Sequence, residues 1–130
     1  MNIRVYYEDT DAGGIVFYAN YLKFAERGRT EYLRSIGFEN TSLEAEHGML
    51  FVVRHVEADY LASARLDDEL TVETEIIELK NASFVMKQVV FCHQKPIFTM
   101  KVVLVAVNND KKPVKLPEKL KDALSSYVCS

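Results

Sequence analysis

An acidic loop ahead of the longest helical pattern carries the residue types best suited to chemistry. Glu8, Asp9 and Asp11 lie close together there and are followed by Gly13 and Gly14. A helix start offers unpaired backbone N–H groups and the positive end of a dipole, which can hold an oxygen that becomes negative during a reaction. A nearby carboxylate can act as a nucleophile or a base. The same residues also suit ordinary capping and turn formation, which is the alternative interpretation.

The helical pattern that follows this loop runs from Tyr18 to Ile36. Apolar side chains recur on one side at helical spacing, and Gly37 provides a stop. Gly28 lies in mid-helix, where glycine costs about 1 kcal/mol relative to alanine. A glycine there indicates a close approach of the helix to other backbone. The apolar positions are Tyr18, Tyr21, Leu22, Ala25, Tyr32, Leu33 and Ile36.

The rest of the chain reads mainly as strands. Residues 71–76 alternate as a strand with one wet face does, whereas residues 102–107 do not, so we expect the latter to be covered on both faces. Short turns at residues 80–82 and 94–96 predict antiparallel hairpins. The predicted strands are Ile3 to Tyr7, Leu50 to Tyr60, Glu69 to Leu79, Ser83 to His93 and Ile97 to Asn108, with a helical turn within Thr41 to His47 and a final short helix, Glu118 to Tyr127, opened by Pro117.

This pattern predicts an α+β domain in which a curved antiparallel sheet of about five strands wraps one long helix, with a short helix near the C-terminus. The strands from Leu50 onward are long for a chain of this size. Their edges must be covered or paired, and pairing with a second copy is the simplest solution. We therefore expect a homo-oligomer.

The composition limits the classes of protein to which the chain can belong. Its 130 residues are 48% apolar and 27% charged, with a net charge of -3. These values suit a single domain over residues 1–130 and argue against a nucleic-acid binder. No apolar run approaches the ~20 residues that span a bilayer, and the N-terminus lacks the apolar stretch of a signal peptide. We therefore expect a cytoplasmic protein with no membrane span.

The cysteines and histidines do not predict a metal site. Cys92 and Cys129 form no CxxC motif, and Cys92 is expected to be a buried reduced thiol. His47, His55 and His93 lie outside the acidic loop, and we expect packing or surface roles for them.

Residues 11–21, DAGGIVFYANY, closely resemble a motif of the 4-hydroxybenzoyl-CoA thioesterase family, which has the hotdog fold. The preceding VYYEDTD is most similar to the YbgC-like acyl-CoA thioesterase branch of that family. The likeness continues through residues 25–31, 51–54, 64–68 and 113–117, and so spans nearly the whole chain. The hotdog fold, a long helix wrapped by an antiparallel sheet, agrees with the fold that the strand pattern predicts.

The resemblance assigns roles within the acidic loop and the helix start. Asp11 occupies the place of the family's catalytic carboxylate, and the backbone N–H of Tyr18 that of the group that polarises the thioester carbonyl. Gly14 supplies the loop geometry, and Asp9 is expected to be structural. Tyr21 matches the motif's closing aromatic residue, with a substrate-binding role or a place in the core as alternatives. Many relatives in this branch have His where Tyr18 stands, so any role of an imidazole there is lost while the backbone donor is retained.

The implied reaction is hydrolysis of an acyl-CoA thioester. Asp11 either attacks the acyl carbon to form a mixed anhydride or acts as a general base on water. No metal or organic cofactor is implied. The phosphates of coenzyme A need cations, and the family's basic positions correspond here to Lys80, at the start of the run that ends at Ser83, and to Lys112. Ordinary surface lysines are the alternative.

The resemblance also implies an active site between subunits of a homodimer or homotetramer. Three other functions stay open. One is a partner-binding hotdog protein of envelope or phospholipid-synthesis assemblies. Another is a thioesterase acting on acyl-carrier protein. A third is a dehydratase, which would pair a histidine with an acidic residue, whereas no histidine lies near Asp11 in the motif.

Overall fold

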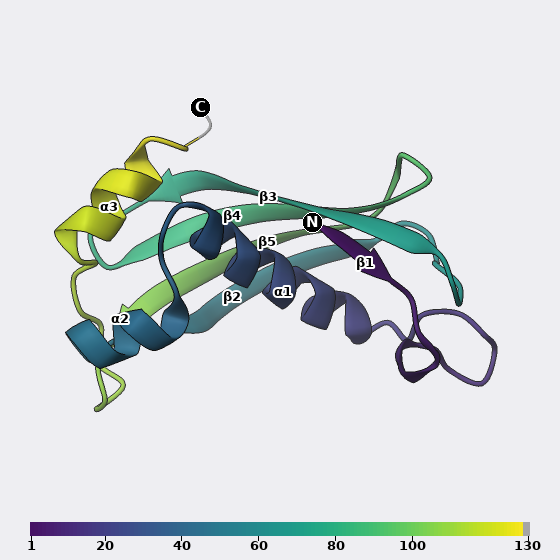
Figure 1. Ribbon diagram of the computed structural model, residues 1–130, viewed down its shortest axis with the longest axis horizontal. Coiled ribbons are helices and arrows are strands. Elements are labelled where there is room, and N and C mark those ends of the chain that lie inside the picture. The colour runs from purple at the N-terminus through teal and green to yellow at the C-terminus, as the bar shows by residue number, and fades with distance from the viewer. Residues whose placement is uncertain (129–130) are drawn as a thin grey trace.

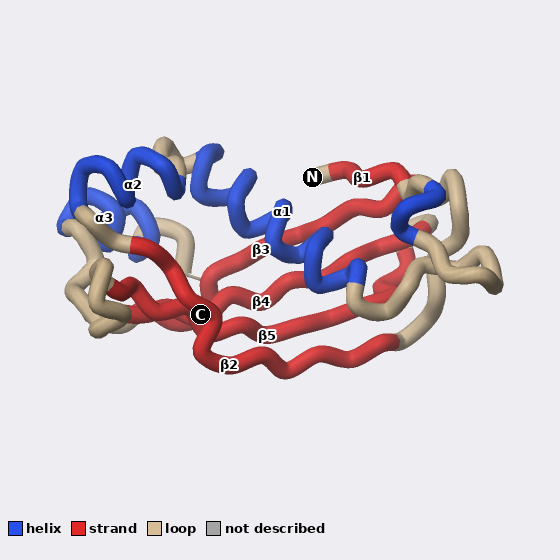
Figure 2. The backbone as a smooth tube through the Cα atoms, turned by 90° about the horizontal axis from the view of Figure 1, so that it is seen from below, coloured by secondary structure: helices blue, strands red, loops and turns tan. Residues whose placement is uncertain are grey.

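A single curved sheet and one long helix make up most of the structure, a computed structural model that describes residues 1–128 (Figure 1). Five antiparallel strands lie in the order β1-β3-β4-β5-β2. Helix α1 lies across one face of the sheet, with β2 at an edge (Figure 2). The elements are β1 (Asn2–Arg4), a 3-10 turn (Tyr7–Asp9), α1 (Asn20–Ser35), α2 (Asn40–His47), β2 (Leu50–Tyr60), β3 (Glu69–Leu79), β4 (Ser83–Cys92), β5 (Lys95–Val107) and α3 (Glu118–Ser125).

Most of the predicted elements are confirmed, because their signals are local. β2 and β3 have the predicted bounds, α1 differs from its prediction by two residues at its start and one at its end, and the polar stretch after it contains α2. Gly37 ends α1 with a φ of +95°, and the N–H of Phe38 donates to Leu33 O at 2.8 Å. Pro117 immediately precedes α3 as predicted.

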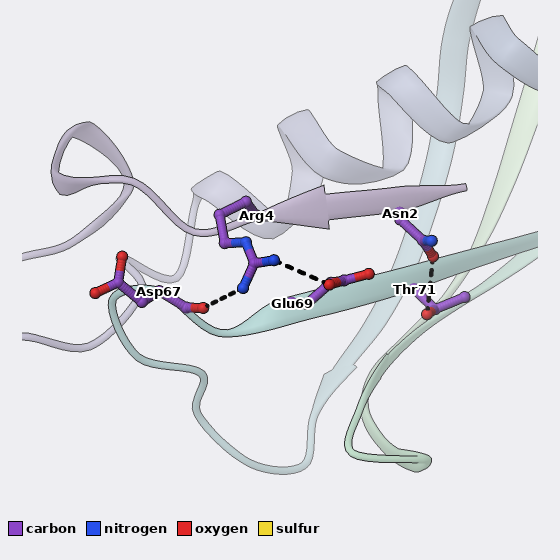
Figure 3. Close-up of polar contacts among 5 residues, drawn as sticks. All are labelled: Asn2, Arg4, Asp67, Glu69 and Thr71. Carbon is purple, nitrogen blue, oxygen red and sulfur yellow. Dashed lines mark hydrogen bonds and ion pairs between the residues drawn. The ribbon is translucent and has the colours of Figure 1, made fainter.

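The prediction for the first strand is wrong at its C-terminal end. β1 stops at Arg4, and the chain enters a 3-10 turn where the sequence pattern predicts a strand to Tyr7. The carboxylate of Asp9 accepts the N–H of Tyr6 at 2.9 Å, while the N–H of Asp9 donates to Tyr6 O at 3.0 Å. These two bonds close a turn that the β-forming side chains do not reveal. β1 itself is held to β3 by polar contacts of Asn2 and Arg4 (Figure 3).

The β4–β5 turn also differs from its prediction. The turn consists of His93 and Gln94, at φ +50° and +67°, and Cys92 pairs with Lys95 across it. Two central residues with positive φ are typical of a tight two-residue hairpin. Pro96 belongs to β5, at a shift in register between β4 and β5. A proline is tolerated there because a bulge does not require its missing N–H.

The core lies between α1 and the sheet. Alternate residues of β3 and β4 are buried against the helix. Of residues 102–107 of β5, predicted to be covered on both faces, all are buried except Val103, which is half-buried. Gly28 does approach the sheet closely, but it meets side chains and not backbone: a Cβ at this position would lie 2.7 Å from Val72 Cγ1. Cys92 is a buried free thiol, as expected, whereas Cys129 lies outside the described residues. None of the described helices is both long and apolar enough to cross a membrane.

Candidate active site

The loop that carries Asp11 is a tight turn closed by backbone hydrogen bonds. The N–H of Asp11 donates to Ile15 O at 2.9 Å, and the N–H of Gly14 donates to Asp11 O at 3.0 Å. Gly14 has a φ of +80°, a conformation that a side chain would strain. The Asp11 carboxylate is exposed, and its Oδ1 accepts the N–H of Gly13 at 2.8 Å. Among residues 1–128 no donor is recorded on Asp11 Oδ2, which leaves that oxygen open for chemistry.

Asp9 fastens this loop to the start of α1. Its side chain is buried, and its Oδ1 accepts a hydrogen bond from Asn20 Nδ2 at 2.9 Å. Its main-chain oxygen accepts the N–H of Phe17 at 2.9 Å. Both carboxylate oxygens of Asp9 are thus engaged, since Oδ2 receives the N–H of Tyr6. These contacts give Asp9 a positioning role, in contrast to the exposed carboxylate two residues later.

The start of α1 presents backbone donors. Helix α1 begins at Asn20 without a side-chain cap, and the first bonded turn uses the N–H groups of Asn20, Tyr21 and Leu22. No acceptor within residues 1–128 is recorded for the N–H of Tyr18. A donor of this kind, at the positive end of the helix, can stabilise negative charge on a ligand oxygen.

A cavity of about 330 Å³ joins these groups. Asp11 and Tyr18 line it together with Tyr21 and with residues 60–63, which follow from the end of β2. Tyr60 packs against both Tyr18 and Tyr21, with ring centroids 6.3 Å and 5.9 Å apart. The cavity therefore combines an acidic residue, a residue at the start of α1 and an aromatic wall.

Tyr21 belongs to both the core and the cavity. Its side chain is 2% exposed, its ring stacks on Phe98 at a centroid distance of 5.3 Å, and its hydroxyl accepts the N–H of Ala64 at 3.0 Å. Burial raises the pKa of Tyr21 above 10.0, and the hydrogen bond from Ala64 opposes part of that rise. The phenol is thus a neutral wall of the cavity at ordinary pH.

The predicted coenzyme A residues lie at the other end of the sheet from Asp11. β3 starts beside the Asp11 loop and runs 11 residues to the β3–β4 turn, which puts Lys80 roughly 33 Å farther along the sheet. Figure 1 shows the loop before α1 at one end of the molecule and the β3–β4 turn, beside α3, at the other. One chain therefore does not bring Lys80 to Asp11.

Lys80, Ser83 and Lys112 do lie near one another in the fold. Ser83 is buried at the start of β4, and its main-chain oxygen accepts the N–H of Lys80 at 2.8 Å. Lys80 also forms an exposed ion pair with Glu78 at 3.5 Å. Lys112 is exposed in the turn that follows β5, at the same end of the sheet, because Ser83 pairs with Val105 near the end of β5 and the N–H of Ala106 donates to Ala82 O at 2.9 Å. Two of the three residues thus present cations to solvent.

Residues 60–63 are the part of the cavity that the sequence did not predict. They lie about 40 residues after Tyr21 and carry no motif of their own. The antiparallel pairing of β2 with β5 sets Tyr60 opposite Phe98, whose ring stacks on Tyr21 near the start of α1. Only the sheet order could have identified them.

Comparison with known proteins agrees with this geometry. Residues 13–97 match the family described as Thioesterase superfamily. The chain is 44% identical to the acyl-CoA thioesterase YbgC of Haemophilus influenzae over 122 residues, covering 93% of this chain and 90% of that protein. It is 37% identical to the acyl-CoA thioesterase YbgC of Helicobacter pylori, covering 97% and 99%.

A solved structure extends the comparison to the fold. A probable thioesterase from Bartonella henselae superimposes with a TM-score of 0.87 at 41% identity, covering 90% of this chain and 97% of that chain. The motif, the wrapped helix and these relatives agree with one another, and the chain belongs to the thioesterase superfamily as a YbgC-like member with the hotdog fold.

Proposed function

We propose that this chain hydrolyses the thioester of acyl-CoA, releasing a free acid and coenzyme A. One observation carries the proposal: Asp11 and Tyr18 line the same cavity, and within residues 1–128 the N–H of Tyr18 has no backbone acceptor. The relatives named acyl-CoA thioesterases support this substrate class. The chain is a thioester hydrolase, as its close relatives are.

The proposed chemistry assigns one task to each group. The N–H of Tyr18 donates to the carbonyl oxygen, which becomes negative as the acyl carbon turns tetrahedral. Asp11 either attacks that carbon through Oδ2, giving an anhydride that water then cleaves, or removes a proton from an attacking water. In both routes the carbon–sulfur bond breaks, the thiolate of coenzyme A leaves, and the oxygen of one water molecule is consumed. The N–H of Gly13 keeps the carboxylate oriented by holding Oδ1. No metal or organic cofactor is required.

The direct test is the variant Asp11→Asn. It removes the negative charge while retaining an oxygen for the N–H of Gly13, so the loop should keep its shape. We expect turnover to fall by about 10³-fold, the usual size of a positioned acid–base contribution. Thiol release from acyl-CoAs of graded length, aromatic ones included, measures it. Glu8→Gln, which removes a neighbouring exposed carboxylate, is the matched control and should hydrolyse normally. Near-normal turnover by folded Asp11→Asn would end the assignment.

The complete site is proposed to need a second copy of the chain, as a homodimer or as a homotetramer built from such dimers. β2 forms an edge of the sheet, and its residues from Val53 to Tyr60 are exposed. Between charged residues, the apolar side chains of Val53, Val56 and Tyr60 are 40% to 48% exposed, and an added strand would cover them. Antiparallel addition of a second β2 would set Lys80 and Lys112 of one copy toward Asp11 of the other.

Mixing two defective variants tests this arrangement. Asp11→Asn lacks the carboxylate, and the double variant Lys80→Ala with Lys112→Ala lacks the proposed phosphate ligands and should show a raised KM for acyl-CoA. If each site combines both copies, a mixed dimer holds one site with all three residues, and activity at low substrate concentration rises on mixing. An unchanged KM in the lysine double variant would remove the lysines from the site. Activities that only average would remove the shared site.

A further inference from the structure

A mixed cluster of metal-binding side chains lies beside the cavity but outside the proposed reaction. Asp68 comes from the loop before β3, Cys92 is the last residue of β4, and His93 is the first residue of the β4–β5 turn. Their ligand atoms all lie within 4.8 Å of one another. Cys92 Sγ is 3.7 Å from Asp68 Oδ2, and His93 Nε2 is 4.0 Å from Asp68 Oδ1.

These spacings are close to those of a tetrahedral zinc site. Zinc bonds of about 2.3 Å to sulfur and about 2.0 Å to nitrogen or oxygen place ligand atoms about 3.3 to 3.6 Å apart at tetrahedral angles. The 3.7 Å between Cys92 Sγ and Asp68 Oδ2 is close to this range, whereas the 4.0 Å between His93 Nε2 and Asp68 Oδ1 exceeds the nitrogen–oxygen value by roughly 0.7 Å. The side chain of His93 is 83% exposed and can move by that amount. Its exposure also leaves the fourth position of the metal open to water.

Backbone hydrogen bonds already hold Asp68 in place without a metal ion. Asp68 Oδ2 accepts the N–H of Arg65 at 2.9 Å, and Asp68 O accepts the N–H of Val5 at 2.9 Å. On either side of Asp68, Arg4 donates to Asp67 O at 2.9 Å and to Glu69 at 3.0 Å (Figure 3). Hydrogen bonds of this kind hold metal ligands in position and are part of a site's affinity.

The donor set selects the metal. A thiolate sulfur, an imidazole nitrogen and a carboxylate oxygen suit zinc and neighbouring transition metals, whereas calcium and magnesium prefer oxygen ligands alone. We propose that Asp68, Cys92 and His93 form a zinc site that fastens the β4–β5 turn to the loop that walls the cavity. Binding replaces the proton of the Cys92 thiol by the metal, and that proton is released to solvent.

The site would act on the cavity through its wall. Ala64 lies between the cavity residues 60–63 and the Asp68 turn, its N–H donates to the hydroxyl of Tyr21, and its main-chain oxygen accepts the N–H of Val16 at 2.9 Å. A metal at Asp68 stabilises this segment and has no part in breaking the thioester. The sequence did not indicate the site, because Asp68 and Cys92 are 24 residues apart and meet only through the β3–β4 pairing.

Metal binding to untagged, metal-stripped protein tests the proposal. Equilibrium dialysis against zinc at micromolar concentration should retain one ion per chain, and cobalt in its place should give a thiolate-to-metal charge-transfer band in the near ultraviolet. His93→Ala, a change at an exposed position that leaves the core intact, should weaken zinc binding at least about 10-fold. Cys92→Ser should abolish the charge-transfer band.

Two variants serve as matched controls. Cys129→Ser removes the other cysteine of the sequence, and His55→Ala removes an exposed histidine on β2. Both should bind zinc as the unmodified chain does. The proposal is overturned if the unmodified chain retains no zinc. It is also overturned if His93→Ala retains as much zinc as His55→Ala, or if the band persists in Cys92→Ser and disappears in Cys129→Ser.

Discussion

Replacing Gly28 by alanine should destabilise the protein although it improves the local helix. The new Cβ would lie 2.7 Å from Val72 Cγ1 and 3.1 Å from Gln88 Nε2. Carbon atoms in ordinary contact are about 3.5 to 4.0 Å apart, so Val72 or the whole of α1 must move by about 1 Å. Gln88 cannot yield freely, because its Nε2 donates to Ala25 O at 2.7 Å and to Thr74 Oγ1 at 3.0 Å.

Three effects determine the size of the change. Overpacking a core typically costs about 1–3 kcal/mol. Displacing the fully buried Gln88 amide from its partners costs about another 1–3 kcal/mol, because the donors and acceptors left behind are out of reach of water. The higher helix propensity of alanine returns about 1 kcal/mol. The free energy of unfolding should therefore fall by about 3 kcal/mol.

Urea unfolding at one fixed protein concentration measures this change, since stability depends on concentration if the chain associates. The background variant Val72→Ala supplies the control. It removes the Cγ1 atom that the new methyl group meets, so Gly28→Ala should cost about 1–2 kcal/mol less there than in the unmodified chain. The reasoning is refuted if Gly28→Ala is as stable as the unmodified chain, or if Val72→Ala leaves its cost unchanged.

Three further changes probe the site. Gly14→Ala places a side chain at a φ of +80° and should cost about 1 kcal/mol while lowering kcat through displacement of Asp11; an unchanged kcat in the thiol-release assay would contradict this. Tyr21→Phe leaves the buried N–H of Ala64 without its acceptor and should lower the free energy of unfolding by about 1–3 kcal/mol in urea. Because burial raises the pKa of Tyr21, the native state keeps a proton that the unfolded state loses, so stability should fall as pH rises above 10. Tyr21→Phe should flatten that fall, and an equally steep fall would show that other groups cause it.

The fold was predictable from the sequence where its signals are local. Helical spacing predicted α1 within two residues and alternation predicted β3, because each pattern reports the face that the element buries. The predictions were wrong where a side chain or a register shift redirects the backbone. A carboxylate, Asp9, closes the turn that ends β1, and Pro96 lies at a register shift inside β5. Neither event alters the hydrophobic pattern.

The candidate site also contains residues that a local motif predicts and residues that only the fold brings together. Asp11, Gly14 and Tyr18 lie within eight consecutive residues, so the motif brings them together before any tertiary structure forms. The cavity wall from Tyr60 to Ser63 depends on the sheet order, and the residue types of this segment do not indicate a role in a site. Close packing at Gly28 was predictable from the cost of glycine in a helix, but its partners, side chains of β3 and β4, were not.

The two halves of the proposed active site can meet through only one sense of strand addition. Asp11 and Lys80 lie at opposite ends of an 11-residue strand. If the β2 strands of two copies paired in the parallel sense, the ends of the two sheets that carry Asp11 would lie side by side, and Lys80 would stay far from both. Antiparallel addition about a twofold axis sets the Asp11 end of each copy beside the Lys80 end of the other, and does so twice. In the proposed dimer, the exposed apolar side chains of β2 and the separation of Asp11 from the lysines would have one cause, and each chain would supply half of two sites.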